Sequence, residues 1–368
     1  MMNKGEFMSL FSNKRMRNFK KSMKDQLMLR ISPLAMPTTI HFEVNDICNL
    51  NCVMCARKSP DVPKDTGNLD PEIVRKTEPE LQIVKYAGLA GNGEPFLHPH
   101  LFDILEILCS SGCVPSIVTN GTLLTEDRRE RLTRTGASIL NISFDGATPE
   151  TFEFIRNGAR FRDVLGNLRK LKARKESRKT PFPIFNFLVC VMKQNSGELE
   201  DIVDIAAELG VMKIEFQTVY PFTNLARESM ITELSQIEKV IGPAVVKARN
   251  LGIQAGMSPL SFGIDARLEH RGEKRTPSTP LFCENIWKIL HVGVNGDVRF
   301  CCFWTGESIG NLAERSIREL WTAPSFVELR RMHKEGKIPP DCRNCHILDI
   351  HRPEIIEKKS GEEIQNYK

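Results

Sequence analysis

The chain has 368 residues, of which 41% are hydrophobic and 26% charged, and its formal net charge is +5. These proportions are ordinary for a folded globular protein and exclude a disordered chain. No uncharged apolar stretch approaches the length of a membrane-spanning helix, and the N-terminus lacks the compact apolar core of a signal peptide. We therefore expect a cytoplasmic protein of about two domains.

Residues 1–36 are expected to form a basic N-terminal extension. Residues 1–30 carry eight basic and two acidic side chains, so the rest of the chain is electrically balanced, which argues against nucleic acid as a partner. Phe19, Met23 and Leu27 are spaced four residues apart and predict one apolar face of a basic amphipathic helix. We expect this face to rest on the next domain. A membrane surface, RNA or an acidic partner are the alternatives.

Residues 37–258 alternate short apolar runs with helical stretches, which is typical of a parallel sheet covered by helices. The expected strands are Thr39–Val44, Gln82–Leu89, Pro115–Thr119, Ile139–Phe144, Ile184–Met192 and Lys213–Thr218. The expected helices lie near Pro71–Glu80, His100–Ser110, Glu126–Arg134, Arg162–Lys175 and Glu198–Leu209. These strands are too few for a complete (β/α)8 barrel. An incomplete barrel and an open doubly wound sheet both fit the pattern.

The last third of the chain is less regular. A helix is expected over Leu234–Asn250, with Gly242-Pro243 kinking or splitting it. Residues 259–348 are expected to hold a linker followed by a compact cysteine-containing module. Residues 349–368 form a charged C-terminal tail with little apolar periodicity, which we expect to be frayed or loosely docked.

The eleven cysteines are too unevenly placed for a disulfide framework, and in a reducing cytosol clustered cysteines indicate metal or redox chemistry. Cys48, Cys52 and Cys55 follow the first expected strand almost directly, so one short loop can aim three thiolates at a single point. Three thiolates are one short of the set that closed iron–sulfur and zinc sites use. A cubane cluster would keep one iron open, whereas a zinc site would need His41 or another side chain to complete it.

The spacing Cys48-x3-Cys52-x2-Cys55 resembles the signature of the radical S-adenosylmethionine (radical SAM) superfamily. The segment from Gly91 to Pro95, after the second strand, is similar to the Gly-Gly-Glu-Pro segment of that family. The resemblance implies that Gly93 and Glu94 meet the cofactor's methionine ammonium, since carboxylates and exposed carbonyls offer only acceptors. It also implies an α/β fold: a partial (β/α)6 TIM-type barrel over residues 37–258.

Three further residues match positions that line the cofactor pocket in the family. Ser143 and Asp145, at the end of the fourth strand, are similar to residues that contact S-adenosylmethionine, although Asp145 is equally suited to capping a turn. Arg156 matches an arginine directed at the methionine carboxylate, which a guanidinium binds bidentately. An exposed helical arginine is the alternative for this position.

The C-terminal cysteines resemble the auxiliary-cluster module of radical SAM proteins, the SPASM/twitch domain. Asn295-Gly296 predicts a hairpin that brings Cys283 and Cys301 together, and a helix from about Ile317 returns the chain to the CxxC pair. The implied ligands of a single auxiliary 4Fe–4S cluster are Cys283, Cys301, Cys342 and Cys345. Three roles are open for Cys302: it replaces Cys301 as a cluster ligand, it donates a hydrogen atom to the substrate, or it only packs against its neighbours. A zinc ribbon is the alternative for the whole module.

The resemblance implies a SAM-binding 4Fe–4S cluster, an auxiliary 4Fe–4S cluster and an external reductant such as flavodoxin or ferredoxin. The reduced first cluster would cleave S-adenosylmethionine to a 5′-deoxyadenosyl radical, which abstracts a substrate hydrogen atom. An auxiliary cluster with four protein ligands suits electron transfer, so we expect dehydrogenation of a sugar-like or cyclitol-like small molecule. The twitch-type dehydrogenases of aminoglycoside synthesis are the resembling enzymes.

The same residues leave three other functions open. A sugar epimerase would need a thiol donor, for which Cys302 or Cys190 qualifies. A peptide maturase commonly carries a peptide-recognition domain, for which residues 1–36 are too short. A non-catalytic iron–sulfur or zinc protein, acting as an electron carrier or scaffold, is the alternative from another class. No catalytic acid or base can be named from the sequence.

Overall fold

A computed structural model describes residues 13–59, 62, 67–220, 222–231, 234–257, 283–302, 304, 306–337, 339 and 342. The expected linker before Cys283, the residue Cys345 and the charged tail after it lie outside the described residues. In this described part of the chain, no helix is both long and apolar enough to span a membrane.

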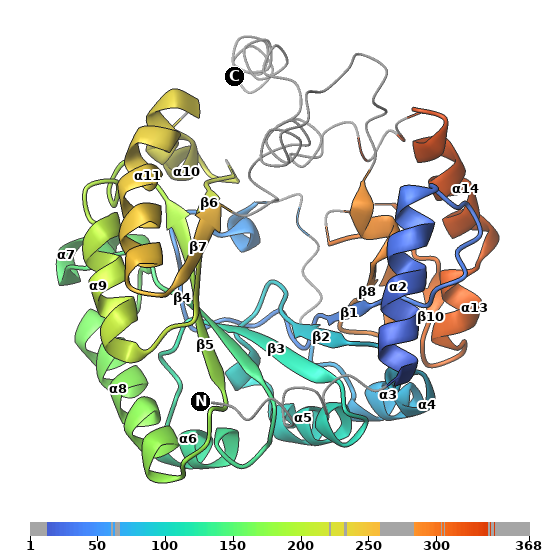
Figure 1. Cartoon of the computed structure of the whole chain (residues 1–368), viewed down its shortest axis with the longest axis horizontal. Coiled ribbons are helices and arrows are strands. Elements are labelled where there is room, and N and C mark those ends of the chain that lie inside the picture. Colours follow the sequence, from blue (N-terminus) through green and yellow to red (C-terminus); the bar gives the residue numbers. More distant parts are fainter. Residues whose placement is uncertain are drawn as a thin grey trace.

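The described strands form one curved sheet in the order β10-β9-β8-β1-β2-β3-β4-β5-β6-β7 (Figure 1). The run from β8 to β7 is parallel throughout, while β9 and β10 pair antiparallel at one end. The strands are β1 Thr39–Phe42, β2 Tyr86–Leu89, β3 Val114–Thr119, β4 Ile139–Ser143, β5 Ile184–Val191, β6 Lys213–Thr218, β7 Gln254–Met257, β8 Ile289–Val292, β9 Asp297–Arg299 and β10 Gly310–Asn311.

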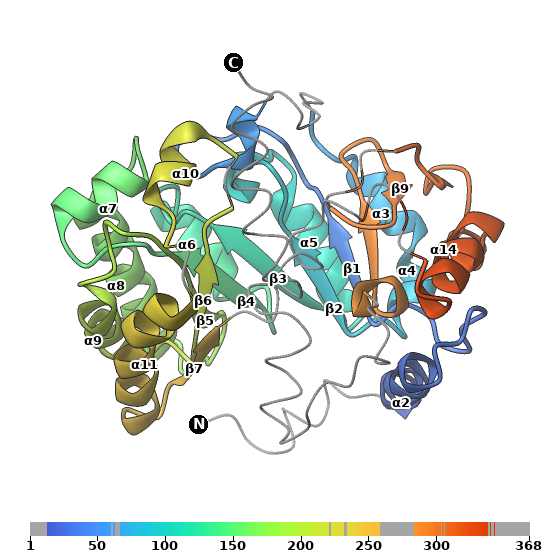
Figure 2. The same ribbon diagram turned by 90° about the horizontal axis from the view of Figure 1, so that it is seen from above.

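Helices cover the convex outer side of this sheet, which leaves the strands on the inside of a crescent (Figures 1 and 2). The α-helices are α2 Asn13–Leu27, α3 Pro71–Lys76, α4 Glu78–Leu81, α5 Leu101–Ser110, α6 Glu126–Leu132, α7 Pro149–Ile155, α8 Phe161–Ser177, α9 Leu199–Leu209, α10 Asn224–Ser229, α11 Leu234–Asn250, α13 Ile317–Trp321 and α14 Pro324–Lys334. Short 3₁₀ helices are η1 Ala56–Lys58, η2 Pro95–Leu97 and η3 Glu284–Trp287.

Strand alternation explains why only one side of the sheet is packed. Along β5 every second residue is fully buried, and the residues between them are half-buried, which is the period of a strand with two different faces. Phe187 belongs to the buried set, and its ring stacks on Phe144 at 4.7 Å. Phe144 in turn contacts Phe152 of α7 and Phe161 of α8. The hydrophobic core therefore lies between sheet and helices, and the concave face remains accessible.

The predicted partial barrel is confirmed, and the six expected strands are β1 to β6. The structure adds a parallel strand at each end of this set: β7 pairs with β6, and β8 pairs with β1. Among the described strands no ladder joins β7 to β8, so the sheet stays open between them. β8 escaped prediction because it belongs to the C-terminal cysteine module, which the sequence pattern separates from the barrel.

The helix before β7 was expected to be kinked or split at Gly242-Pro243, and the structure shows that it is not split. α11 runs from Leu234 to Asn250 with Pro243 inside it. Pro243 is exposed, whereas Ile241, Ala244 and Ala248 are buried. Burial of these flanking residues holds the helix together across the hydrogen bond that proline cannot donate.

The expected orientation of the N-terminal helix is wrong. α2 forms as predicted, but Phe19, Met23 and Leu27 are 40%, 49% and 82% exposed. The face that packs on the protein is polar, with Arg15, Asn18, Ser22 and Asp25 buried. The reason is that these side chains bond to main-chain groups of the body, for example Arg15 Nε to the Val84 carbonyl oxygen at 2.9 Å. These polar contacts, and not the spacing of the apolar residues, determine which face of α2 packs on the protein.

The C-terminal module is built onto the barrel around a buried arginine. The predicted hairpin at Gly296, where φ is +83°, joins β8 to β9. Arg330 of α14 is fully buried and donates from Nε to the Ile286 carbonyl and from Nη1 to the Trp321 carbonyl, both at 3.0 Å. Its guanidinium also lies 4.3 Å from the Trp321 and Phe326 rings. These contacts fix the 3₁₀ helix η3, which directly follows Cys283.

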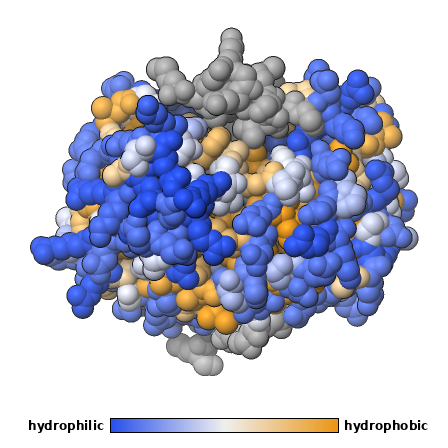
Figure 3. All heavy atoms as spheres, turned by 90° about the horizontal axis from the view of Figure 1, so that it is seen from below, coloured by the Kyte–Doolittle hydropathy of each residue, from blue (hydrophilic) through white to orange (hydrophobic). Residues whose placement is uncertain are grey.

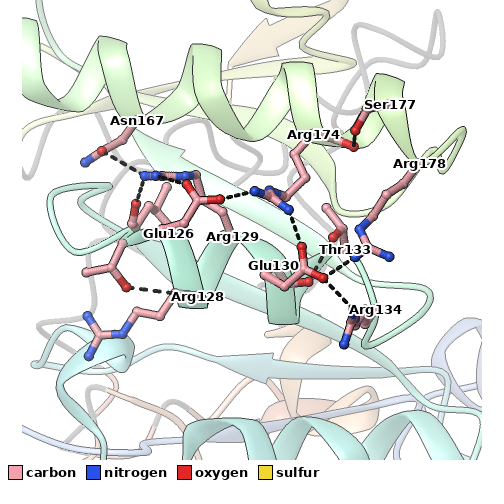
Figure 4. Close-up of polar contacts among 12 residues, drawn as sticks. Glu126, Arg128, Arg129, Glu130, Thr133, Arg134, Asn167, Arg174, Ser177 and Arg178 are labelled. Carbon is pink, nitrogen blue, oxygen red and sulfur yellow. Dashed lines mark hydrogen bonds and ion pairs between the residues drawn. The ribbon is translucent and has the colours of Figure 1, made fainter.

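Arginine and glutamate side chains join α6 to α8 on the outer surface. The face shown in Figure 3 is most strongly hydrophilic on its left, the side of α6 and α8. There Glu130 accepts from Arg174 and Arg178 of α8 and forms an ion pair at 2.7 Å with Arg134 (Figure 4). One carboxylate therefore separates three guanidinium groups.

Replacing Glu130 with glutamine is expected to lower the free energy of unfolding by about 1 kcal/mol, because the three arginines then repel one another without a central anion. Urea unfolding measures this difference, which should shrink at high salt. Glu176→Gln is the matched control, since Glu176 is exposed and its ion pair with Lys172 is long, at 3.8 Å. Equal stability of the two variants at low salt would contradict the expectation.

Candidate active site at the carboxyl end of the sheet

The loop that carries Cys48, Cys52 and Cys55 follows β1 and is held by the end of α7. The Asn51 N–H donates to the Asn157 carbonyl at 2.8 Å, and the Val53 N–H donates to the Ile155 carbonyl at 3.1 Å. These two bonds bracket Arg156 on one side and Cys52 on the other. The backbone of the loop therefore lies against Arg156, the positively charged residue at the C-terminal end of α7.

Arg156 points its guanidinium at this loop. Its Nη1 lies 3.8 Å from the Cys52 Sγ, and its Nε donates to Asp145 Oδ2. Asp145 is fully buried and also accepts from the Cys190 N–H at 2.6 Å. The carboxylate therefore fixes the arginine's direction. Arg156 is only 14% exposed, which excludes the alternative of an exposed helical arginine.

Gly93 and Glu94 lie against the first turn of the same loop. The Glu94 N–H donates to the Ile47 carbonyl at 2.8 Å, and the Asn45 side-chain amide donates to the Glu94 carbonyl at 3.0 Å. A Cβ on Gly93 would lie 1.9 Å from Asn45 Oδ1 and 2.8 Å from the Ile47 carbonyl oxygen. Only glycine lets the two loops approach this closely.

Gly93→Ala is therefore expected to push the cysteine loop outward, with a loss of about 1–3 kcal/mol in unfolding free energy from overpacking and a lower iron content after reconstitution. Gly166→Ala is the matched control, because a Cβ there meets nothing within 4 Å. Since Gly166 lies inside α8, the control should be more stable than the parent protein by up to about 1 kcal/mol. Calorimetry and iron analysis of both variants measure these effects, and a Gly93→Ala protein with full iron and parental stability would contradict the packing argument.

The Glu94 side chain ties the loops after β2 and β3 together. Its carboxylate is 2% exposed and accepts from Thr119 Oγ1 at 2.7 Å, the Asn120 N–H at 2.8 Å and the Phe96 N–H at 3.2 Å. Burial raises the pKa of Glu94, and these donors act against that rise. Glu94 is thus first of all a structural anchor, while its predicted contact with the methionine ammonium stays a prediction.

Asn120 links this anchor to the cysteine loop, and sequence reasoning missed it. Its side-chain amide lies 4.0 Å from the Cys48 Sγ and donates to Asn49 Oδ1 at 3.0 Å. The signal available in the sequence was an Asn-Gly pair directly after the third expected strand, a position typical of functional loops in parallel α/β folds. Ser143 is the last residue of β4, where it is buried and lies on the same face of the strand as Asn141.

The electrostatics of the three thiols favour a bound cation. Burial raises the pKa of Cys48, and the neighbouring charges of Glu94, Cys52 and Cys55 raise it further. Burial likewise raises the pKa of Cys52, but the Arg156 guanidinium opposes it. Three adjacent thiolates repel one another unless positive charge lies between them. A cationic iron–sulfur cluster ligated by these sulfurs would supply that charge, so the donor set fits such a group.

The described residues contain no preformed set of three or more His, Cys, Asp or Glu side chains arranged around a metal ion. His41, one of the side chains that could complete a zinc site with the cysteines, packs against other residues. Its ring lies 4.9 Å from the His291 ring, and a Cβ on Gly88 would lie 2.9 Å from His41 Cδ2. The fit of an iron–sulfur cluster at this loop therefore rests on its cysteine spacing, its backbone hydrogen bonds and the nearby Arg156, and not on His41.

The concave face of the sheet carries several polar side chains, which the strand pattern alone did not reveal. Asn141 donates to Ser116 Oγ at 2.7 Å, and Asn186 donates to Asn141 Oδ1 at 3.1 Å. Burial lowers the pKa of His41 to about 4 and the pKa of His291 well below its ordinary value, so both imidazoles are neutral at pH 7. Uncharged hydrogen-bonding groups therefore extend across β8, β1, β3, β4 and β5.

The predicted auxiliary ligands lie in the C-terminal module as far as the described residues extend. Cys283 directly precedes η3, and its N–H lies 3.4 Å from His333 Nδ1. Cys301 and Cys302 follow the end of β9, and the Cys342 N–H donates to the Pro339 carbonyl at 3.0 Å. The fourth predicted ligand, Cys345, falls outside the described residues, so the auxiliary site stays a prediction.

Comparisons with known proteins agree with this arrangement. Residues 42–206 match the family described as the radical SAM superfamily, and residues 283–346 match an iron–sulfur cluster-binding domain named SPASM. The chain is 28% identical over 311 residues to the AdoMet-dependent heme synthase of Methanosarcina barkeri, covering 80% of this chain and 85% of that protein.

A second relative is the tungsten-containing aldehyde ferredoxin oxidoreductase cofactor-modifying protein of Pyrococcus furiosus. It is 23% identical over 333 residues, covering 84% of this chain and 87% of its own length. Among solved structures, SuiB of Streptococcus suis bound to the precursor peptide SuiA shares the fold with a TM-score of 0.65. That match has 15% identity and covers 91% of this chain and 74% of SuiB.

Proposed function

Because this chain belongs to the radical SAM superfamily and carries a SPASM domain, we propose that it is an oxidoreductase that cleaves S-adenosylmethionine reductively and dehydrogenates its substrate. When bound, a 4Fe–4S cluster at the cysteine loop supplies the electron for cleavage to a 5′-deoxyadenosyl radical, and an auxiliary cluster in the C-terminal module accepts an electron from the substrate. Flavodoxin or ferredoxin is the proposed reductant.

The convergence of three loops on the cysteines is the observation that carries this proposal. The Gly93 loop touches the first turn of the cysteine loop, and Arg156 lies against Cys52. Active sites of parallel α/β folds lie at the carboxyl ends of the strands, where β1, β2 and β4 bring these loops. The proposed cluster ligands are Cys48, Cys52 and Cys55, with Cys283, Cys301, Cys342 and Cys345 in the auxiliary module.

The residues around the loop have distinct proposed tasks. Arg156 offers guanidinium donors to the methionine carboxylate, since its charge faces the cysteines and Asp145 holds it in place. Glu94 holds the loop carbonyls that accept from the methionine ammonium, with Gly93 giving access to them. Ser143 and Asp145 stay proposed for the cofactor pocket, Asp145 as the residue that positions Arg156.

The substrate proposal rests on the polar concave face. Neutral amide, hydroxyl and imidazole groups suit a substrate rich in hydroxyl or amine groups better than a charged or apolar one. A sugar-like or cyclitol-like molecule has this chemistry. The names of the two relatives, a heme synthase and a cofactor-modifying protein, support a small-molecule substrate without pointing to a sugar.

A peptide substrate is the second candidate, and the fold shared with SuiB favours it, because that structure holds a precursor peptide. Backbone amides of a peptide also match the polar groups of the concave face. A peptide and a cyclitol differ in mass, so mass spectrometry of the reaction product distinguishes the two candidates.

The proposed function is tested with anaerobically reconstituted full-length protein. Reduced protein is expected to convert S-adenosylmethionine to 5′-deoxyadenosine and to oxidise 2-deoxy-scyllo-inosamine, used as the probe cyclitol. Cys342→Ala should keep the uncoupled cleavage and lose the oxidation, whereas the control Cys109→Ala should keep both. Absence of cleavage by the parent protein refutes the enzyme assignment and favours an electron carrier or scaffold. Cleavage without oxidation of the probe rejects the cyclitol.

A further inference from the structure

The helix α2 presents a row of apolar side chains to solvent. Met16, Phe19, Met23 and Leu27 are 38%, 40%, 49% and 82% exposed. Their spacing of three and four residues places them on one side of the helix. Met28 and Leu34, 51% and 60% exposed, continue the exposed apolar surface beyond its end. We call these six residues the apolar row.

A row of basic side chains runs beside the apolar row. Its members are all exposed on α2: Lys14, Arg17, Lys20, Lys21 and Lys24. The only acidic residue of the helix, Asp25, is 1% exposed and accepts from the main-chain N–H groups of Leu34 and Ala35 at 2.8 Å. Lys85 adds a further positive charge 5.3 Å from the Phe19 ring. The exposed surface of α2 is thus apolar and cationic.

The packing of α2 keeps both rows outward. Asn18 bonds twice to the main chain of Met36, at 3.0 Å and 2.9 Å. Ser22 Oγ lies 3.3 Å from the Trp287 carbonyl oxygen, and Arg15 donates to Val84. Turning the apolar row inward would leave these buried polar groups without partners, which costs more than the exposed apolar surface. The exposure is therefore a property of the fold.

We propose that α2 is a docking surface for a negatively charged lipid bilayer. In Figure 2, α2 lies at one edge of the molecule. A bilayer surface deforms around an exposed helix, so that the apolar side chains of the helix enter the boundary of the acyl chains. The lysines of the helix then extend their charges to anionic headgroups. A folded acidic protein would need a matching groove to cover the same row, so the lipid surface fits better.

The proposal is independent of the radical chemistry and is tested by vesicle flotation of the full-length protein. The probes are vesicles of phosphatidylcholine alone and of phosphatidylcholine with phosphatidylglycerol in equal parts. We expect the protein to float with the anionic vesicles only. The triple variant Lys20→Glu, Lys21→Glu and Lys24→Glu should lose at least about a hundredfold in partitioning, because each lysine near an anionic surface contributes about fivefold.

The apolar row has its own variant, Phe19→Ser, Met23→Ser and Leu27→Ser, which is also expected to abolish flotation. The matched control reverses three exposed charges on the opposite side of the molecule, with Lys170→Glu, Lys239→Glu and Arg249→Glu. It should float like the parent protein. Thermal unfolding of all variants should be unchanged, since only exposed side chains are altered.

Three results would overturn the proposal. The first is a parent protein that does not float with anionic vesicles. The second is equal loss of flotation in the control and the α2 charge variant, which would indicate unspecific attraction. The third is retention on polyglutamate resin that depends on Lys20, Lys21 and Lys24 without any vesicle binding, which would assign α2 to an acidic protein partner.

Discussion

Replacing Cys52 with alanine is expected to abolish the formation of 5′-deoxyadenosine completely. Two thiolates leave two irons of a cubane cluster without a protein ligand, and the proposed site needs three. Cys52 is also the sulfur that Arg156 approaches at 3.8 Å, so its removal separates the proposed cluster from the proposed carboxylate-binding arginine. Iron content and product formation, measured on the anaerobically reconstituted variant, report both losses.

Cys109→Ala serves as the control for the loss of a thiol as such. Cys109 lies on α5, where its sulfur is 3.9 Å from the Ala137 carbonyl oxygen, and burial raises its pKa to about 12. Cys109 lies outside both the cysteine loop and the C-terminal module, so we propose no metal-binding role for it. The control should retain the parent iron content and activity. Product formation by Cys52→Ala above the background of iron-free protein would show that the cysteine loop is not the cluster site.

Replacing Arg156 with methionine is expected to lower the free energy of unfolding by about 3–5 kcal/mol, because it leaves a buried carboxylate without its counter-ion. Asp145 is fully buried, and its remaining donor is the Cys190 N–H at 2.6 Å. Burial then raises the pKa of Asp145 without the opposing guanidinium. A carboxyl whose pKa is higher in the folded state is stabilised by protonation, so the deficit should shrink as the pH falls.

The double variant Asp145→Asn, Arg156→Met separates this charge effect from lost packing. Because it removes both charges, we expect it to be more stable than Arg156→Met alone, and its stability relative to the parent protein should lack the pH dependence that Asp145 contributes. Urea unfolding at several pH values measures both proteins. If the single and the double variant lose the same stability, Asp145 is not the partner of Arg156, and the argument for its positioning role fails.

The sequence was most informative where local patterns decide the structure. Short apolar runs between helical stretches located β1 to β6, since each of these strands buries side chains against the covering helices. The hairpin at Gly296 was predictable because Asn-Gly is a strong hairpin signal, and Gly296 takes a positive φ of +83° in the turn. The cysteine spacing, the glycine loop and the arginine all reside in short segments, so their resemblance to the radical SAM superfamily was visible without a structure.

The features that escaped prediction depend on contacts between distant segments. β8 pairs with β1 across a separation of about two-thirds of the chain, and such pairing leaves no local signal. The orientation of α2 is set by Asn18 and Ser22 bonding to Met36 and Trp287, which outweighs its apolar period. The Glu94 carboxylate accepts from Thr119 and Asn120, and these partners could not be predicted because they are distant in sequence.

The most direct test of the account is magnetic: electron–nuclear double resonance on the reduced full-length protein, frozen with S-adenosylmethionine isotopically labelled at its amino nitrogen. We predict a coupling between the cluster's unpaired electron and the labelled nitrogen, because three cysteines leave one iron for the amino acid group. Its loss in Cys52→Ala would locate that iron at the loop. A fully reconstituted protein without this coupling, or one that holds zinc in place of iron, would contradict the assignment.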